Sequence, residues 1–95
     1  MVYVKFNNMN FDLPTKKGYF MYSKSGCKFC RMAKDLLPCV TVINVDKHIE
    51  TDKARCLDQL ATIAEVEIST FPVVFFNEIF IGGYTESKDH LNMME

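Results

Sequence analysis

Two cysteines separated by two residues stand where a β-like run passes into a helix-like run. The run 19–22 (YFMY) is typical of a strand, and 32–37 (MAKDLL) has the composition of a helix. We therefore expect Cys27 at the start of the helix and Cys30 one turn further in. Unpaired backbone N–H groups at a helix start stabilise an anion, so the chemistry of the pair depends on this junction.

The remaining apolar runs and turn signals predict an α/β fold. We expect strands at 19–23, 40–45, 73–76 and 79–81, and helices at 27–37, 50–64 and 85–93. Strands joined through a helix run parallel with a right-handed crossover, whereas the short link at 77–78 requires an antiparallel hairpin. The prediction is a mixed four-stranded sheet, in the order β-α-β-α-β-β-α, with helices on both faces. An extra N-terminal strand within 2–6 is left open.

Length and composition indicate one ordinary globular domain. The 95 residues are expected to form a single unit, with an N-terminal extension at 1–17 and a core at 18–93. A hydrophobic share of 48% and a net charge of −1 indicate neither nucleic acid nor membrane as partner. The N-terminus lacks the pattern of a signal peptide, so we expect a cytoplasmic, monomeric protein in a reducing compartment. Four cysteines there favour redox or metal chemistry over a disulfide framework.

The charges are distributed unevenly along the chain. Residues 16–34 carry six basic side chains and no acid, whereas ten of the acids lie at or after Asp46. The cysteine pair belongs to the basic segment. This surrounding favours an anionic thiolate and an anionic substrate.

The pair has two chemical interpretations, redox exchange and metal binding. A free thiol has a pKa of about 8.5, and Cys-X-X-Cys pairs at helix starts have values of roughly 3.5–7.5, so the reactive thiolate becomes abundant. In the redox interpretation Cys27 is the exposed nucleophile and Cys30, turned inward, is the resolving thiol. Cys-X-X-Cys is also half of a zinc site, but the sequence shows no second half, since Cys39 and Cys56 are single. We favour redox exchange and expect no metal.

Two further stretches have both a plain and a functional interpretation. Pro72 follows Thr70 and Phe71 at a strand entrance, which by itself favours a simple boundary. A cis peptide bond there would leave the backbone of Phe71 free to pair with an extended ligand. The stretch 82–86 (GGYTE) permits a turn with close ligand approach, and Thr85 is expected to cap the last helix.

Together the stretches 24–34 (KSGCKFCRMAK), 70–72 (TFP) and 81–86 (IGGYTE) resemble the glutaredoxin family of the thioredoxin fold over residues 18–93. The resemblance implies a glutathione-dependent thiol–disulfide oxidoreductase, with glutathione as co-substrate and disulfide-containing or glutathionylated proteins as partners. It also favours a cis bond before Pro72. The implied site residues are the catalytic Cys27 and Cys30, and, for glutathione, Lys24, Phe29, Phe71, Pro72, Gly83, Thr85 and Glu86, with Gln59 and Ser69 as weaker candidates at the rim.

The sequence departs from the family pattern within this site. Lys28 stands where proline is commoner, Phe71 replaces the usual valine, and residues 65–69 lack the usual basic or amide residue. The absence of a basic or amide residue at 65–69 weakens the expected binding of glutathione. Two alternatives therefore stay open: a thioredoxin-like electron donor to a specific enzyme such as ribonucleotide reductase, and an iron–sulfur cluster carrier that uses Cys27 and glutathione as ligands.

Other conspicuous side chains have simpler interpretations. Cys39 and Cys56 are expected to be buried small apolar residues, with glutathionylation of Cys56 as the alternative. Tyr84 and Phe80 are expected to be packing residues. His48 and His90 are expected at the surface or in loops.

Overall fold

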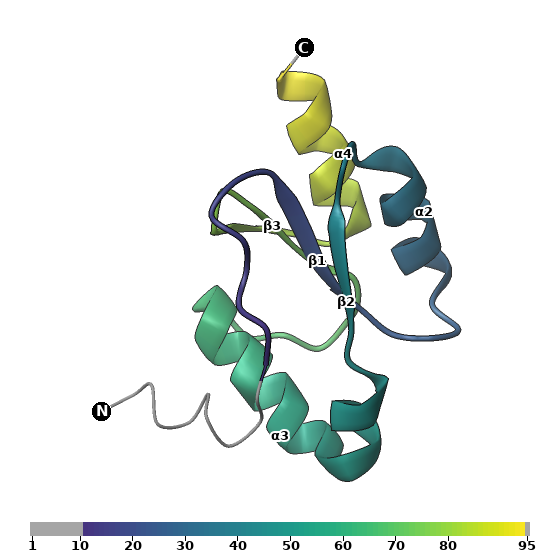
Figure 1. The fold of residues 1–95 in the computed structure, drawn as a ribbon, viewed down its shortest axis with the longest axis vertical. Coiled ribbons are helices and arrows are strands. Elements are labelled where there is room, and N and C mark those ends of the chain that lie inside the picture. Colours follow the sequence, from purple (N-terminus) through teal and green to yellow (C-terminus); the bar gives the residue numbers. More distant parts are fainter. Residues whose placement is uncertain (1–10, 95) are drawn as a thin grey trace.

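A computed structural model describes residues 11–94 of the chain, and the possible strand within 2–6 lies outside the described residues. Three helices and four strands follow in the predicted order (Figure 1). The elements are β1 (Tyr19–Ser23), α2 (Lys28–Leu36), β2 (Thr41–Asn44), α3 (Asp46–Ala64), β3 (Val73–Phe76), β4 (Ile79–Gly82) and α4 (Tyr84–Met93).

The strands form one mixed sheet in the order β2-β1-β3-β4. β1 pairs in parallel with β2 and antiparallel with β3, and β3 pairs antiparallel with β4. All five residues of β1 are buried, because this strand has a neighbour on each side and helices on both faces. The mixed thioredoxin-like sheet predicted from the sequence is confirmed.

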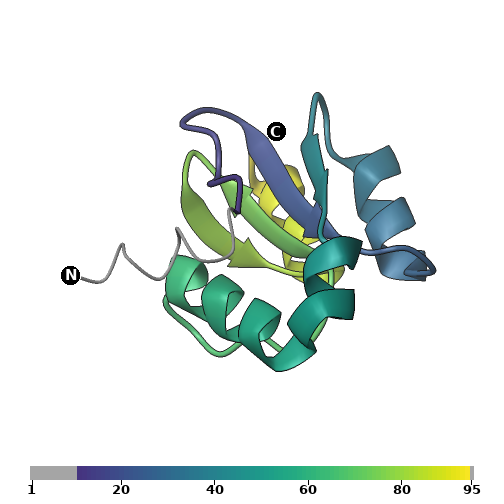
Figure 2. The same cartoon turned by 60° about the horizontal axis from the view of Figure 1, so that its bottom comes forward.

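The helices divide between the two faces of the sheet. Phe20 and Tyr22 of β1 pack with Cys56 and Leu60 of α3, whereas the alternate residues of β1 pack toward α2 and α4. Figure 2 shows α3 and α4 on opposite sides of the sheet, and Figure 1 shows α2 beside α4. Phe11 joins the α3 side, where its ring meets Tyr22 edge to face at 5.8 Å.

The β3–β4 hairpin also fixes the start of β1. Asn77 and Glu78 both have positive φ, 50° and 72°, which suits a two-residue turn between twisted strands. Asn77 accepts a hydrogen bond from the Gly18 N–H at 2.8 Å and donates its own N–H to the Gly18 carbonyl at 3.1 Å. The short link predicted at 77–78 therefore also holds the chain where it enters the sheet.

Helix α3 differs from the prediction at its start. It begins at Asp46, four residues before the expected position, and is interrupted at Asp52, whose φ of −165° and ψ of 94° are not helical. The Asp52 carboxylate accepts the Arg55 N–H at 3.1 Å, as an N-cap residue does. The helix start expected near residue 50 therefore lies close to this second helix start, and the helical turn that begins at Asp46 was not predicted.

The start of α4 was also predicted incorrectly. The N-cap is Gly83, and Thr85 lies within the first turn, so Thr85 does not cap the helix. Glu86 takes the capping role, because its Oε1 accepts the Gly83 N–H at 2.9 Å. Within the described residues, no helix is long and apolar enough to span a membrane.

Candidate active site

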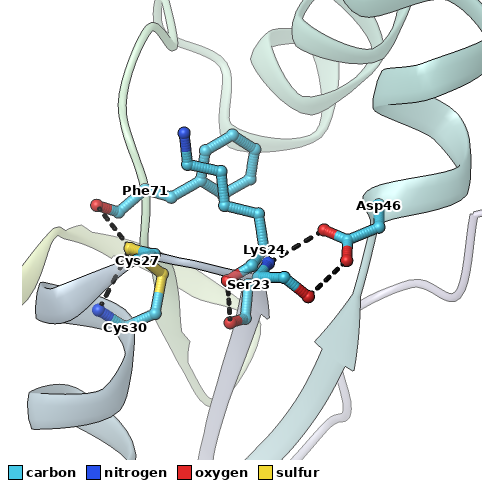
Figure 3. The surroundings of a disulfide bond; sticks show 7 residues. Ser23, Lys24, Cys27, Cys30, Asp46 and Phe71 are labelled. Atoms are coloured by element: carbon cyan, nitrogen blue, oxygen red, sulfur yellow. Dashed lines mark hydrogen bonds between the residues drawn. A yellow bond between two sulfur atoms is a disulfide. The ribbon is translucent and has the colours of Figure 1, made fainter.

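Cys27 and Cys30 are joined by a disulfide at the start of α2 (Figure 3). Their Cα atoms are 5.2 Å apart, and Cys27 is the N-cap of the helix. Cys27 is half-buried, whereas only 3% of Cys30 is exposed. The predicted difference between an outer and an inner sulfur is therefore present in the fold, because Cys30 faces the core across one helical turn.

The Sγ of Cys27 lies between a backbone donor and a backbone acceptor. The N–H of Cys30 donates to this sulfur at 3.2 Å, and the carbonyl oxygen of Phe71 lies 3.7 Å from it (Figure 3). A backbone N–H directed at sulfur favours its anionic form, which is the nucleophile in disulfide exchange. The Phe71 carbonyl places the loop before β3 directly against the reactive atom.

The loop before Cys27 is held by the first residue of α3. The Asp46 carboxylate accepts the Ser25 N–H at 2.9 Å and the Ser25 hydroxyl, while the Asp46 N–H donates to the Asn44 side chain at 2.8 Å. The Ser25 hydroxyl and N–H hold the pKa of the Asp46 carboxyl below its usual value, with a smaller contribution from Lys24. The sequence analysis missed this contact. A signal existed, since parallel β1 and β2 end at the same edge of the sheet.

Lys24 extends over the aromatic ring of Phe71. Its Nζ lies 5.8 Å from the ring centroid, within the range of a cation–π contact (Figure 3). Lys24 is exposed and Phe71 is half-buried. Phe71 therefore supplies an aromatic surface for the lysine that the smaller valine of the family pattern would lack.

A shallow groove of about 300 Å³ lies beside the disulfide, between the loop before β3 and the start of α4. Every residue predicted to bind glutathione lines it, except Lys24. The Phe71–Pro72 peptide bond is cis, as the family resemblance implied, so the plain strand-entrance interpretation is insufficient. The lining residues are Phe29, Thr70, Phe71, Pro72, Gly83, Tyr84, Thr85 and Glu86.

Two neighbouring aromatic rings line this groove. Phe29, 51% exposed, lies with its ring centroid 5.9 Å from that of Tyr84. The pair joins α2 to the start of α4, so it connects the cysteine helix with the opposite wall. Tyr84 was expected only as a packing residue; it does pack against the core, but its contribution to the groove was not predicted.

The weaker candidates and the other cysteines have different positions. Gln59 is buried on α3, and its Oε1 has no hydrogen-bond partner among the described residues, so it does not lie at the rim. Ser69 is exposed and lines a neighbouring cavity together with Glu67 and Glu86. Cys39 is exposed, contrary to prediction, because it stands in the turn before β2 with a φ of 53°. Cys56 is buried, as predicted, and burial raises its pKa to about 11.

The histidines also differ from the prediction. Both lie in helices and are half-buried, rather than in loops or at the surface. His48 stacks on Phe11 with ring centroids 4.3 Å apart, and the Nδ1 of His90 lies 2.8 Å from the Tyr19 hydroxyl. Residues 11–94 contain no group of three His, Cys, Asp or Glu side chains arranged to hold a metal ion.

Fold and site together define a thiol–disulfide oxidoreductase with a thioredoxin-like fold, because a bonded Cys-X-X-Cys pair at a helix start faces a cis-proline loop. The family profile for Glutaredoxin matches residues 20–81, and the chain belongs to this family. No curated protein sequence matches it significantly.

Solved glutaredoxin structures resemble the chain over most of its length. Glutaredoxin C1 from Populus tremula x tremuloides, solved in its holo form, has a TM-score of 0.69 at 21% identity, covering 95% of this chain and 88% of that one. Glutaredoxin 1 from Francisella tularensis has a TM-score of 0.64 at 23% identity, covering 81% and 94%. The dithiolic glutaredoxin 2-C-Grx1 from Trypanosoma brucei brucei has a TM-score of 0.61 at 26% identity, covering 88% and 92%. The first two likenesses show the fold.

Proposed function

We propose that this chain is a glutathione-dependent oxidoreductase that reduces protein disulfides or glutathione mixed disulfides in the cytoplasm. Cys27 is the nucleophile and Cys30 is the resolving thiol. The observation that carries this proposal is the groove beside the disulfide, which six of the seven residues assigned to glutathione line.

The exchange proceeds through a mixed disulfide on Cys27. The Cys27 thiolate attacks one sulfur of the substrate disulfide, forms a bond to it and releases the other sulfur as a thiolate. The Cys30 thiol, as its thiolate, then attacks Cys27, frees the second substrate thiol and leaves the Cys27–Cys30 disulfide present in this structure. Two glutathione molecules restore the dithiol. The first bonds to Cys27 and releases Cys30, and the second removes the first as glutathione disulfide.

Two parts of the groove, together with Lys24 beside it, suit a tripeptide bonded to Cys27. Phe71 precedes β3, and its carbonyl faces the sulfur, so its backbone is placed to pair with an extended peptide. The first N–H groups of a helix have no partner within the helix, so those of Thr85 and Glu86 suit a carboxylate. Lys24 adds a positive charge above Phe71 for a second carboxylate.

One observation favours a second function, electron donation to a specific enzyme with recharging by a flavoprotein reductase. The cavity that adjoins the groove is lined by Glu67 and Glu86, and residues 65–69 supply no basic side chain there. Negatively charged side chains in this position repel the carboxylates of glutathione. A protein that gains little from glutathione binding would depend on another reductant.

Reduction of a small mixed disulfide, coupled to glutathione, glutathione reductase and NADPH, tests the proposal. We expect turnover that saturates with glutathione and disappears in Cys27→Ser. Cys39→Ser is the matched control, since Cys39 is exposed and does not line the groove, and it should retain full turnover. Turnover that glutathione does not support, but that a thioredoxin-type reductase does, would establish the second function instead.

A further inference from the structure

A second pocket, of about 330 Å³, lies directly at the disulfide and is separate from the glutathione groove. It is formed where α2 meets the ends of β1 and β2, and we call it the basic pocket. Both Cys27 and Cys30 line it, and it shares no lining residue with the groove. Its lining residues are Met21, Ser23, Lys24, Ser25, Gly26, Cys27, Cys30, Arg31, Lys34, Val42 and Asn44.

Three cationic side chains line the basic pocket, and no acid does. Arg31 and Lys34 are exposed on the same face of α2, since they stand three residues apart, and Lys24 contributes from the loop before it. The Asp46 carboxylate accepts the Ser25 N–H at the wall of the pocket, and Lys24 contributes to lowering the pKa of that carboxyl. Arg31 and Lys34 are the two cations that α2 contributes to the pocket.

The charged side chains of two cavities have opposite signs. The cavity beside Pro72 is lined by Glu67 and Glu86 and by no cation, whereas every charged residue that lines the basic pocket is a cation. Of these two cavities, Cys27 and Cys30 line only the basic pocket, so a peptide bonded to Cys27 would meet the cations directly.

We propose that the basic pocket binds an acidic segment of the protein whose disulfide is reduced, with carboxylates within a few residues of the target cysteine. The pocket shares its wall with the reactive sulfurs, so residues next to a target cysteine reach it without a rearrangement of the fold. Met21 and Val42 give it an apolar part, which suits a peptide segment better than a free inorganic anion. This inference rests on disulfide exchange at Cys27 and is independent of glutathione.

Two synthetic peptides of one sequence test the inference. Each carries one cysteine as a mixed disulfide with the neutral thiol 2-mercaptoethanol, flanked by glutamates in one peptide and lysines in the other. Pre-reduced protein is mixed with each peptide, quenched in acid, alkylated and measured by mass, so no glutathione is needed. Solvent-exposed ion pairs are individually weak, so we expect the acidic peptide to react roughly threefold to thirtyfold faster at low salt. The preference should fall toward unity as salt screens the charges.

Charge-reversal variants at two sites distinguish an effect of the basic pocket from an effect of the protein's net charge. Arg31→Glu with Lys34→Glu should abolish or invert the preference, and Arg31→Gln with Lys34→Gln should bring it near unity. Lys53→Glu with Arg55→Glu, on exposed positions of α3, changes the net charge equally and should preserve it. Equal rates of the wild type on both peptides, or an equal loss in the α3 variant, would overturn the inference. Failure of the reduced protein to exchange with either peptide would instead overturn the proposed function.

Discussion

The carbonyl oxygen of Phe71 lies 3.7 Å from the Sγ of Cys27, and the backbone N–H of Cys30 donates to the same sulfur at 3.2 Å. The N–H of Cys30 thus favours the thiolate, whereas the carbonyl of Phe71 can accept a hydrogen bond from the neutral thiol. This relationship joins two segments that are 44 residues apart in the sequence. The reactivity of Cys27 therefore depends in part on the loop before β3, along which a peptide substrate would lie.

Replacement of each cysteine of the motif should abolish a different set of reactions. We expect Cys30→Ser to keep reducing glutathione mixed disulfides, because Cys27, the more accessible of the two sulfurs, needs only an external thiol to complete that exchange. The same variant should accumulate mixed disulfides with dithiol substrates, since no resolving thiol remains. Cys27→Ser should react at the uncatalysed rate. Activity that survives in Cys27→Ser and is lost in Cys30→Ser, in both assays, would reverse the two roles.

Gly82 should tolerate no side chain. Its φ is 130°, and a Cβ at this position would lie 2.6 Å from the Cβ of Glu86, the residue that caps α4. We expect Gly82→Ala to lower the free energy of unfolding by about 2–4 kcal/mol, as backbone strain and overlap combine. Gly26→Ala is the matched control, because Gly26 also has positive φ but an added Cβ meets nothing within 4 Å. Its cost should be about 1–2 kcal/mol, measured by urea unfolding, and equal losses would contradict the role of Glu86.

The two cysteines outside the motif should differ sharply in reactivity. In the oxidised protein, iodoacetamide should modify exposed Cys39 quickly and reach buried Cys56 only in denaturant, as peptide mass analysis would show. Because burial raises the pKa of Cys56 to about 11 from an ordinary 9.0, the fold holds the neutral thiol. Its contribution to stability is complete below pH 9.0 and declines as the pH rises toward 11. Cys56→Ala should remove that alkaline decline, and rapid native labelling of Cys56 would contradict the burial.

Asp46 should make the loop before Cys27 sensitive to acid. The Ser25 hydroxyl and N–H stabilise the ionised carboxylate and lower its pKa, so this contribution is complete above the ordinary value of 3.8. It is lost as the pH falls through the lower pKa of the folded protein. We expect Asp46→Asn to lower the urea midpoint at pH 6 and to match the wild type in strong acid. Asp58→Asn, exposed on α3, is the control, and the same pH dependence in both variants would exclude a specific role for Asp46.

The sequence by itself determined the order of the elements and the local identity of the site. The strand 19–23 and the hairpin link at 77–78 follow from runs of apolar residues and from turn chemistry, which are properties of neighbouring residues. The motif at Cys27 and Cys30 likewise needed only a strand followed by a helix. The family resemblance, and not the local pattern, indicated the cis bond before Pro72.

Only the tertiary structure decided which distant residues meet. It placed Asp46 against Ser25, exposed Cys39 in a turn and buried Gln59, each of which depends on packing between elements. It also divided the surroundings of the disulfide into a groove and a basic pocket with no common residue. Charge counted along the chain shows only that residues 16–34 are basic. The fold decides which of those cations face the reactive sulfurs, because that depends on the side of α2 that packs against the sheet.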